Sequence, residues 1–291
     1  MRSLPPYEYL APKDLDEVCA MLVKHGEDAR ILAGGTDLLL GMRERTLTCR
    51  AVIGLKQVPG LDRCSGDKGI TLGPLVTHRA VVDNPLIRMR YSALWKACSK
   101  VGTPNIRSMG TVGGNCCNGA PSADTVPPLI AYNAAVTLKS LSGERSLPLA
   151  SFFLAPGKTA LMPGEVLVAI TVPDLPLHTG ADYVKLPART SVDIAAVGVA
   201  ACITLDAQKR CREAHIVLGA VAPTPIEAKG AEVLLIGEKL TRPVIEKAAQ
   251  VATEHCCPIS DVRASAVYRA EMVAVLTAQA LDAALAQAAA A

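Results

Sequence analysis

The sequence has 291 residues, which is long for a single hydrophobic core and predicts two or three domains. Half of the residues are hydrophobic, only 3% are aromatic, and the formal net charge is +3. The 30 basic and 27 acidic residues are interleaved, with no Lys/Arg run that could follow a phosphate backbone, so nucleic acid is not an expected partner. The apolar composition fits either a large aliphatic core or a surface covered by partner subunits.

The two ends of the chain predict a cytoplasmic protein without a membrane span. The first residues lead directly into Pro5-Pro6, without the apolar region of a signal peptide. No uninterrupted apolar stretch approaches the roughly 20 residues that cross a bilayer. The Ala-rich C-terminus carries Asp282 and several Gln residues, which predicts a solvated helix end.

The ten cysteines include two adjacent pairs, Cys116-Cys117 and Cys256-Cys257, and no C-x-x-C spacing. This pattern argues against a zinc site or an iron–sulfur cluster, and the five scattered His residues include no H-E-x-x-H motif. We therefore expect no metal in this chain. In a reducing compartment such cysteines are expected to act as small buried hydrophobes.

The N-terminal part of the chain predicts a β-α-β pattern. Asp14 is the expected N-cap of a helix with Glu17 in the capping-box position, and Gly26 is its expected end. Short strands are predicted over residues 29–33 and 51–55, with a turn or helix beginning at residue 38 between them.

The remaining elements indicate a mixed middle part and a C-terminal part of strands followed by helices. In the middle part we predict a strand at 70–72, helices from 77, from 86 to 98 and from 127, a loop at 103–105, and strands at 135–138 and 166–172. After an expected linker at 174–180, we predict antiparallel strands at 198–205 and 215–218, then helices at 243–257 and from 265 onward.

Several nucleotide and catalytic motifs are missing from the sequence. There is no G-x-G-x-x-G fingerprint and no G-x-S-x-G nucleophile elbow. The Gly157-Lys158-Thr159 run is not the end of a P-loop, because Phe152 occupies the position of the required earlier glycine.

Two glycine clusters remain, Gly34-Gly35-Thr36-Asp37 and Gly113-Gly114-Asn115, which we predict to be tight turns at strand ends. Such turns expose consecutive N–H groups that can bind anions, and two facing turns suit a pyrophosphate. Thr36 and Thr111 add hydroxyl groups, while Asp37 and Asp124 could hold ribose hydroxyls or adenine, or cap the next helix. Either cluster alone indicates no more than a turn; together they favour a phosphorylated ligand.

Two longer motifs contain these glycine clusters: residues 31–38 are ILAGGTDL, and residues 111–124 are TVGGNCCNGAPSAD. They resemble the first and the second FAD loop of a known family, the FAD-binding subunits of the molybdenum hydroxylases. The resemblance extends over nearly the whole chain, and the runs 118–120 and 221–226 resemble most the FAD subunit of bacterial xanthine dehydrogenases.

The resemblance implies an α+β fold: a two-subdomain FAD-binding fold of the vanillyl-alcohol-oxidase type, followed by a smaller α+β C-terminal domain. The implied FAD-binding domain covers residues 1–175, with subdomains of about 1–58 and 59–175, and the C-terminal domain covers residues 181–291. The FAD is expected to be bound non-covalently.

In this family the two glycine segments wrap the pyrophosphate and ribityl chain of FAD. The resemblance implies a first contact segment formed by Ile31, Leu32, Ala33, Gly34, Gly35, Thr36, Asp37 and Leu38. It implies a second segment formed by Gly110, Thr111, Gly113, Gly114, Asn115, Cys117 and Asn118. It further implies contacts to the sugar and phosphate from Ala123 and Asp124, to the ring or adenine from Val101, Gly102 and Ile106, and along the cofactor from Leu167 and Lys185.

The implied activity is electron transfer within an oxidoreductase complex. A molybdopterin-binding large subunit would oxidise the substrate, a small subunit with 2Fe–2S clusters would relay electrons, and the FAD of this chain would pass them to NAD or another acceptor. No catalytic acid or base is implied here. Lys185 is expected to tune the flavin, or else to be an ordinary surface lysine, and the loop 187–192 leaves the acceptor open.

Three alternatives remain at the level of the sequence. The chain could belong to a related aldehyde, nicotinate or carbon monoxide dehydrogenase instead of a purine-oxidising enzyme. It could be a free-standing flavin oxidoreductase, although its length leaves little room for a substrate-binding cap domain. It could also bind a nucleotide without catalysing any reaction.

Overall fold

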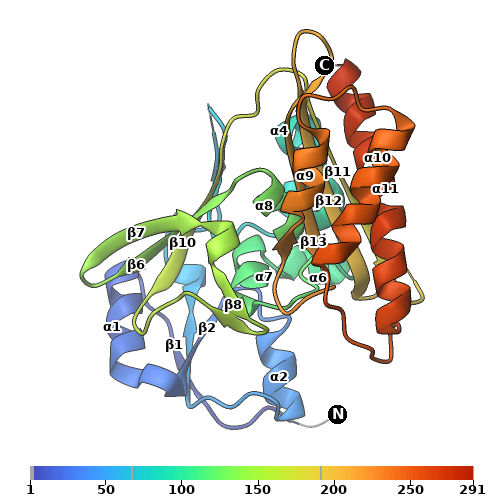
Figure 1. The fold of residues 1–291 in the computed structure, drawn as a ribbon. Coiled ribbons are helices and arrows are strands. Elements are labelled where there is room, and N and C mark those ends of the chain that lie inside the picture. Colours follow the sequence, from blue (N-terminus) through green and yellow to red (C-terminus); the bar gives the residue numbers. More distant parts are fainter. Residues whose placement is uncertain (1–2, 67, 191, 291) are drawn as a thin grey trace.

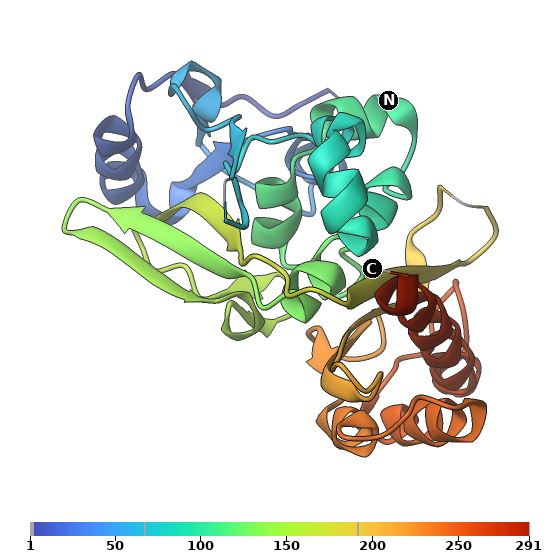
Figure 2. The same ribbon diagram turned by 90° about the horizontal axis from the view of Figure 1, so that it is seen from above.

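The computed structural model describes residues 3–66, 68–190 and 192–290, so that one position of the loop 187–192 lies outside the described residues. The described chain forms three main sheets in chain order (Figure 1). The N-terminal and middle parts lie next to each other, and the C-terminal part packs against the middle part (Figure 2). This arrangement is the α+β architecture expected from the sequence.

The N-terminal part is a three-stranded parallel sheet of order β1-β3-β2 with two helices. Its elements are β1 (Glu8–Leu10), α1 (Leu15–His25), β2 (Ala29–Leu32), α2 (Leu38–Glu44) and β3 (Ala51–Gly54). Asp14 caps α1 by accepting a hydrogen bond from the Glu17 backbone N–H at 2.8 Å, and Gly26 ends it with φ 52°, as predicted. Leu32 pairs with Gly54, so β2 and β3 end at the same edge of the sheet.

The middle part is a five-stranded sheet of order β4-β5-β10-β6-β7, with six short helices packed beside it. Its strands are β4 (Cys64–Ser65), β5 (Ile70–Leu72), β6 (Ala135–Ser140), β7 (Gly143–Pro148) and β10 (Val166–Val172). Its helices are α3 (His78–Asp83), α4 (Pro85–Arg90), α5 (Ser92–Ser99), α6 (Pro104–Met109), α7 (Val112–Asn118) and α8 (Val126–Ala131). A separate two-stranded ribbon consists of β8 (Phe153–Ala155) and β9 (Lys158–Thr159).

Two predictions for the middle part were wrong. The helix predicted over 86–98 is divided between α4 and α5 at Tyr91, whose buried ring packs edge-on against Tyr132 and whose hydroxyl donates to the Pro173 carbonyl at 3.0 Å. The segment expected to be a loop at 103–105 contains the start of α6. There Thr103 is the N-cap and Pro104 occupies the first turn, where its missing N–H costs nothing.

The C-terminal part is an antiparallel sheet of order β11-β12-β13-β14. Its strands are β11 (Thr179–Pro187), β12 (Ala195–Leu205), β13 (Cys211–Gly219) and β14 (Ile226–Glu227), and its helices are α9 (Lys229–Leu235), α10 (Arg242–Ala252) and α11 (Ala266–Ala290). Helix α11 packs against β11 and β12, α9 packs against β13, and α10 packs against these two helices (Figure 1). Helices α5 and α8 of the middle part also pack against this sheet. All 11 residues of β12 are therefore buried.

The end of helix α11 is exposed to solvent on one face, as predicted from the sequence, and is buried on the other face. Its residues pack across β11 and β12, and the approach is so close that a Cβ on Gly180 would lie 2.1 Å from the Ala284 carbonyl oxygen. The 25-residue helix has the length and apolar composition of a membrane-crossing helix, and 44% of its apolar 18-residue stretch is buried inside the protein. The small Ala side chains of the buried face allow this close contact.

Candidate functional site

The two glycine segments lie directly against each other. The first follows β2, and a Cβ placed on Gly34 would lie 2.1 Å from the Met109 carbonyl oxygen and 2.9 Å from Gly110 Cα. A Cβ placed on Gly114 would lie 3.8 Å from that of Ala33. Glycine at position 34 thus permits a backbone-to-backbone contact between segments about 75 residues apart in the sequence.

The first segment is a turn with free N–H groups. Gly35 has φ 76°, a left-handed conformation that favours glycine. Within the described part of the chain, the backbone N–H groups of Gly34, Gly35 and Thr36 have no hydrogen-bond acceptor. Asp37 is exposed and its carboxylate does not cap α2, so the capping role is not used. Consecutive free N–H groups in such a turn form a binding surface for an anion.

The second segment is not the turn that we predicted, because it forms the first part of helix α7. Thr111 is the N-cap, and its hydroxyl oxygen accepts from the Gly114 N–H at 3.0 Å. A Cβ on Gly113 would lie 2.6 Å from Pro74 Cα, so this glycine is required by close packing. The segment also follows helix α6, whereas the sequence suggested a preceding strand.

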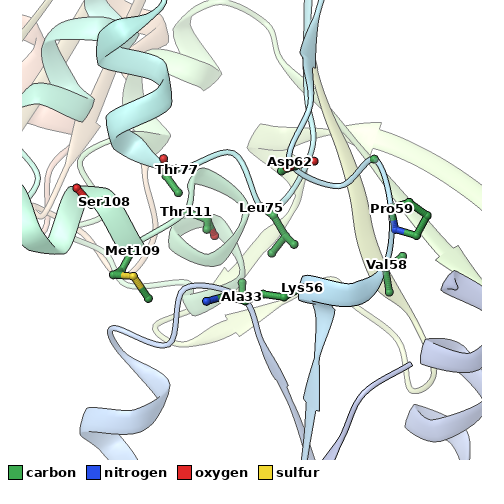
Figure 3. A pocket seen from close by; sticks show the side chains of 11 residues that line it. Ala33, Lys56, Val58, Pro59, Asp62, Leu75, Thr77, Ser108, Met109 and Thr111 are labelled. Carbon is green, nitrogen blue, oxygen red and sulfur yellow. The ribbon is translucent and has the colours of Figure 1, made fainter. Parts of the chain in front are cut away.

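A cavity of about 420 Å³ opens where these segments meet the end of the N-terminal sheet. Of the predicted residues, Ala33 and Thr111 line it (Figure 3). The other lining residues were missed: Lys56, Val58, Pro59, Gly60, Asp62, Leu75, Thr77, Ser108 and Met109.

A topological signal could have identified part of this missed group. Residues 55–62 follow β3 as the first glycine segment follows β2, and the two strands are parallel neighbours. Ligands of open α/β sheets bind outside the carboxyl ends of the strands. Because the glycine segment after β2 was predicted to bind a ligand, the loop after β3 could have been predicted to lie at the same site.

His78 lies beneath the second segment and was also missed. Its backbone N–H donates to the Gly110 carbonyl at 3.0 Å, and a Cβ on Gly110 would lie 3.2 Å from the His78 ring. The side chain is buried, and its Nδ1 has no hydrogen-bond partner. Burial and the nearby Arg107 guanidinium lower the pKa of His78 from 6.5 to about 4.

Asp124 and Lys185 form a buried ion pair between the middle and C-terminal parts. The Lys185 ammonium donates to Asp124 Oδ2 at 2.7 Å and to the Lys100 carbonyl at 3.0 Å. The Tyr183 hydroxyl donates to Asp124 Oδ1 at 2.8 Å. Burial raises the pKa of Asp124, an effect that the Lys185 charge partly offsets.

These contacts correct two of the sequence alternatives. Lys185 is only 7% exposed, so it is not an ordinary surface lysine. The carboxylate of Asp124 does not cap α8, because it accepts hydrogen bonds from Tyr183 and Lys185 instead. Whether either residue also contacts a cofactor stays a prediction.

The remaining predicted residues are distributed around these two centres. Val101, Gly102 and Ile106 lie together at the turn between α5 and α6, where the Arg107 side chain donates to the carbonyls of Val101 and Gly102. Leu167 is 2% exposed in the core of the middle part and does not line the cavity. The others lie in or beside the glycine segments: Ile31, Leu32 and Leu38 are half-buried, Ala123 is buried, Cys117 is half-buried and Asn118 is exposed.

A turn with free N–H groups, a capped helix start and a cavity between two sheets define a protein that binds a phosphorylated ligand. Comparison with known proteins identifies the ligand and the class. Residues 5–175 match the family described as "FAD binding domain in molybdopterin dehydrogenase", and residues 182–284 match "CO dehydrogenase flavoprotein C-terminal domain". The chain belongs to the FAD-binding medium-subunit family of the molybdenum hydroxylases.

Relatives with different substrates match at similar levels. The carbon monoxide dehydrogenase medium chain of Hydrogenophaga pseudoflava is 33% identical, covering 97% of this chain and 98% of its own. A solved structure of carbon monoxide dehydrogenase from the same organism gives a TM-score of 0.95 at 32% identity, covering 98% of this chain and 99% of that one. The 6-hydroxypseudooxynicotine dehydrogenase subunit alpha of Paenarthrobacter nicotinovorans is 31% identical, covering 97% of this chain and 95% of its own. A putative xanthine dehydrogenase FAD-binding subunit of Escherichia coli is 30% identical, covering 92% of each. We expected a particular likeness to xanthine dehydrogenase subunits, but these comparisons do not favour them over the other relatives.

The observed site fits FAD. The free N–H groups of the first segment suit the pyrophosphate, and the cavity volume lies within the range of cofactor sites. When bound, FAD supplies two-electron and one-electron redox chemistry. The chain supplies the binding surface, holds the two segments in contact and places buried charges beside them.

Proposed function

We propose that this chain is the electron-transfer subunit of a three-subunit molybdenum hydroxylase, in which its FAD accepts electrons from 2Fe–2S clusters of a small partner subunit. The observation that carries the proposal is the direct contact of the two glycine segments at the cavity between the N-terminal and middle parts. Family membership supports FAD as the ligand of that cavity. Substrate oxidation is assigned to a molybdopterin-binding large subunit.

The proposed role of the site residues is binding and orientation. Gly34, Gly35 and Thr36 would donate backbone N–H groups to the pyrophosphate, and the start of α7 would add its positive end. The residues inferred from the family resemblance are retained as the proposed cofactor contacts, with Lys56 and Thr77 added from the cavity. We also propose a division into an FAD-binding domain at 1–175 and a C-terminal domain at 181–291. The stretch of chain between β10 and β11, which contains no helix or strand, supports this division.

The proposed substrate of the complex is a purine, with NAD as the proposed acceptor. The purine hypothesis rests on the likeness of runs 118–120 and 221–226 to xanthine dehydrogenase subunits. Carbon monoxide is the second candidate, favoured by the slightly higher identity of the carbon monoxide dehydrogenase medium chain, 33% against 30%. Nicotinate or an aldehyde remains a further possibility in the same class.

The proposal can be tested on the complex purified through a tag on this chain. Under anaerobic conditions, xanthine, carbon monoxide and nicotinate are added separately, and reduction of the flavin is followed by loss of its visible absorbance. We expect one substrate to reduce the flavin in the complex and none to reduce the isolated chain. Addition of NAD should then restore the oxidised spectrum if NAD is the acceptor.

Two results would contradict the proposal. Reduction of the isolated chain by an organic substrate would indicate a free-standing flavoenzyme. Purification without partner subunits under all conditions would remove the electron donor that the proposal requires. Failure of NAD alone would change only the acceptor.

A further inference from the structure

Thr125 has an unusual position at the start of helix α8. As the N-cap it would ordinarily accept a hydrogen bond from the N–H of the second or third helical residue. Those residues are Pro127 and Pro128, which have no N–H. The Thr125 hydroxyl therefore makes no cap hydrogen bond and is available for another partner.

That partner is Asn115 in the second glycine segment. The Thr125 hydroxyl donates to Asn115 Oδ1 at 2.6 Å, and the Thr125 side chain is fully buried. The short contact fixes the amide so that its oxygen faces Thr125. An Asn amide has one acceptor oxygen and one amino group, so the amino group must point to the opposite side.

The Asn115 amino group is then a free and accessible donor. The structure gives it no hydrogen bond within the described residues. Asn115 is half-buried, but its Nδ2 atom is not among the described buried atoms that lack a hydrogen-bond partner. Because Nδ2 has no partner, it must be accessible. Asn115 lies on α7, whose N-cap Thr111 lines the cavity.

The C-terminal part holds Thr125 in this position. The preceding residue, Asp124, is bound on one carboxylate oxygen by Tyr183 and on the other by Lys185, both from β11. A continuous series of contacts thus connects β11 through Asp124 and Thr125 to Asn115.

We propose that Thr125 is a positioning residue that orients Asn115 so that its amino group donates to an acceptor oxygen of the bound FAD. This inference rests on the proposed function, because the acceptor belongs to FAD. Without the Thr125 hydroxyl the Asn115 amide is free to rotate, and its oxygen can face the electron-rich cofactor instead.

The test measures FAD affinity of the full chain by quenching of FAD fluorescence, together with the thermal midpoint of each variant. Thr125→Val removes the hydroxyl with little change in volume and is expected to weaken FAD binding about tenfold. Thr125→Ser keeps the hydroxyl and is expected to stay within about threefold of the wild type. In the Asn115→Ala background, Thr125→Val should cause no further loss.

Asn115→Asp provides a second route, because it keeps an acceptor for Thr125 and removes the amino donor. We expect it to bind FAD at least about tenfold more weakly while remaining folded, even if Thr125→Val is unstable. As a matched control, Thr204→Val removes a buried hydroxyl bonded to Thr179 in the C-terminal sheet. It should lower the thermal midpoint but leave FAD affinity unchanged.

The proposal is overturned by wild-type affinity of Thr125→Val or Asn115→Asp, by equal losses in the Val and Ser variants, or by additive losses in the double variant. Failure of the wild-type chain to bind FAD is a different result. It would contradict the proposed function itself. This outcome is seen in the wild-type chain, so it is distinguished from failure of the Thr125 proposal without the variants.

Discussion

His78 is a neutral buried side chain directly under the backbone where the two glycine segments meet. Its imidazole fills the space below Gly110, and its main chain holds the Gly110 carbonyl. A charged imidazole at this position would be desolvated and repelled by Arg107. The neutral ring therefore acts as a packing residue for the second segment.

This environment predicts a pH dependence of stability. The folded-state pKa of His78, about 4, is below its ordinary value of 6.5, so the unfolded chain binds the extra proton between these values. Stability is complete above pH 6.5 and decreases as the pH falls, by about 3 kcal/mol at pH 4 from this residue alone. Urea denaturation at several pH values should show this decrease in the wild type and a smaller one in His78→Gln. Parallel curves for the two proteins would contradict the assignment.

The cysteines of the second segment are predicted to be unreactive. Cys116 is fully buried, and burial raises the pKa of Cys117 to about 12, so neither forms thiolate at neutral pH. Cys257, in contrast, is exposed. Alkylation of the native chain followed by mass spectrometry should modify Cys257 and spare Cys116 and Cys117, with the denatured chain as control. Rapid labelling of Cys117 would indicate a reactive thiol beside the cofactor.

At the scale of elements, the proposed cofactor site depends on the contact between the turn after β2 and the end of α6. Gly34→Ala places a Cβ 2.1 Å from the Met109 carbonyl oxygen, and neither backbone can yield without moving the other segment. We expect a loss of stability of about 1–3 kcal/mol and a loss of FAD binding of at least about tenfold.

The control for this prediction is Gly143→Ala at the start of β7, directly after the turn from β6. Gly143 has φ 132°, so alanine is strained there, but no atom lies within 4 Å of the added Cβ. This variant should lose stability and keep its FAD affinity. Equal FAD affinity of the Gly34 and Gly143 variants would show that the contact between the segments does not form the cofactor site.

Elements with local signals could be predicted from the sequence, and elements set by distant contacts could not. The cap at Asp14 and the end at Gly26 are local, and both were correct. The break at Tyr91 depends on Tyr132 and Pro173, which are 41 and 82 residues away in the sequence. No local pattern around residue 91 contains this information.

The candidate site shows the same division. The two glycine segments were found because their motifs are local, but the close packing of Gly113 against Pro74 has no local signal in the sequence. The cavity residues Lys56 and Asp62 belong to no sequence motif. They lie at the cavity because they follow β3, which is the neighbour of β2 in the sheet. The burial of Lys185 depends on Asp124, 61 residues earlier.

At the scale of the whole molecule, polar contacts that are buried or partly buried attach the C-terminal part to the middle part. Lys96 of α5 donates to both carboxylate oxygens of Asp182 at 2.8 and 2.7 Å, and Ser92 donates to the Ala181 carbonyl at 2.7 Å. With the Lys185–Asp124 pair, these contacts join β11 to the helices beside the cofactor segments. The two parts should therefore unfold together.

Removing one of these contacts should destabilise the entire chain. Asp182 is 5% exposed, and Asp182→Asn leaves Lys96 without its charged partner, which we expect to cost about 1–3 kcal/mol. The control Asp83→Asn removes the exposed ion pair with Arg79 and should cost less than about 0.5 kcal/mol. Urea denaturation followed by fluorescence of Trp95 measures both. Equal effects of the two substitutions would contradict a buried connection.

The most direct test of the central claim is the absorbance spectrum of the chain purified alone, recorded before and after denaturation. The site geometry and the family predict the two visible bands of a bound flavin, with release of free FAD on unfolding because the attachment is non-covalent. A colourless chain that also failed to take up added FAD would contradict the claim. It would mean that the two glycine segments meet for packing alone.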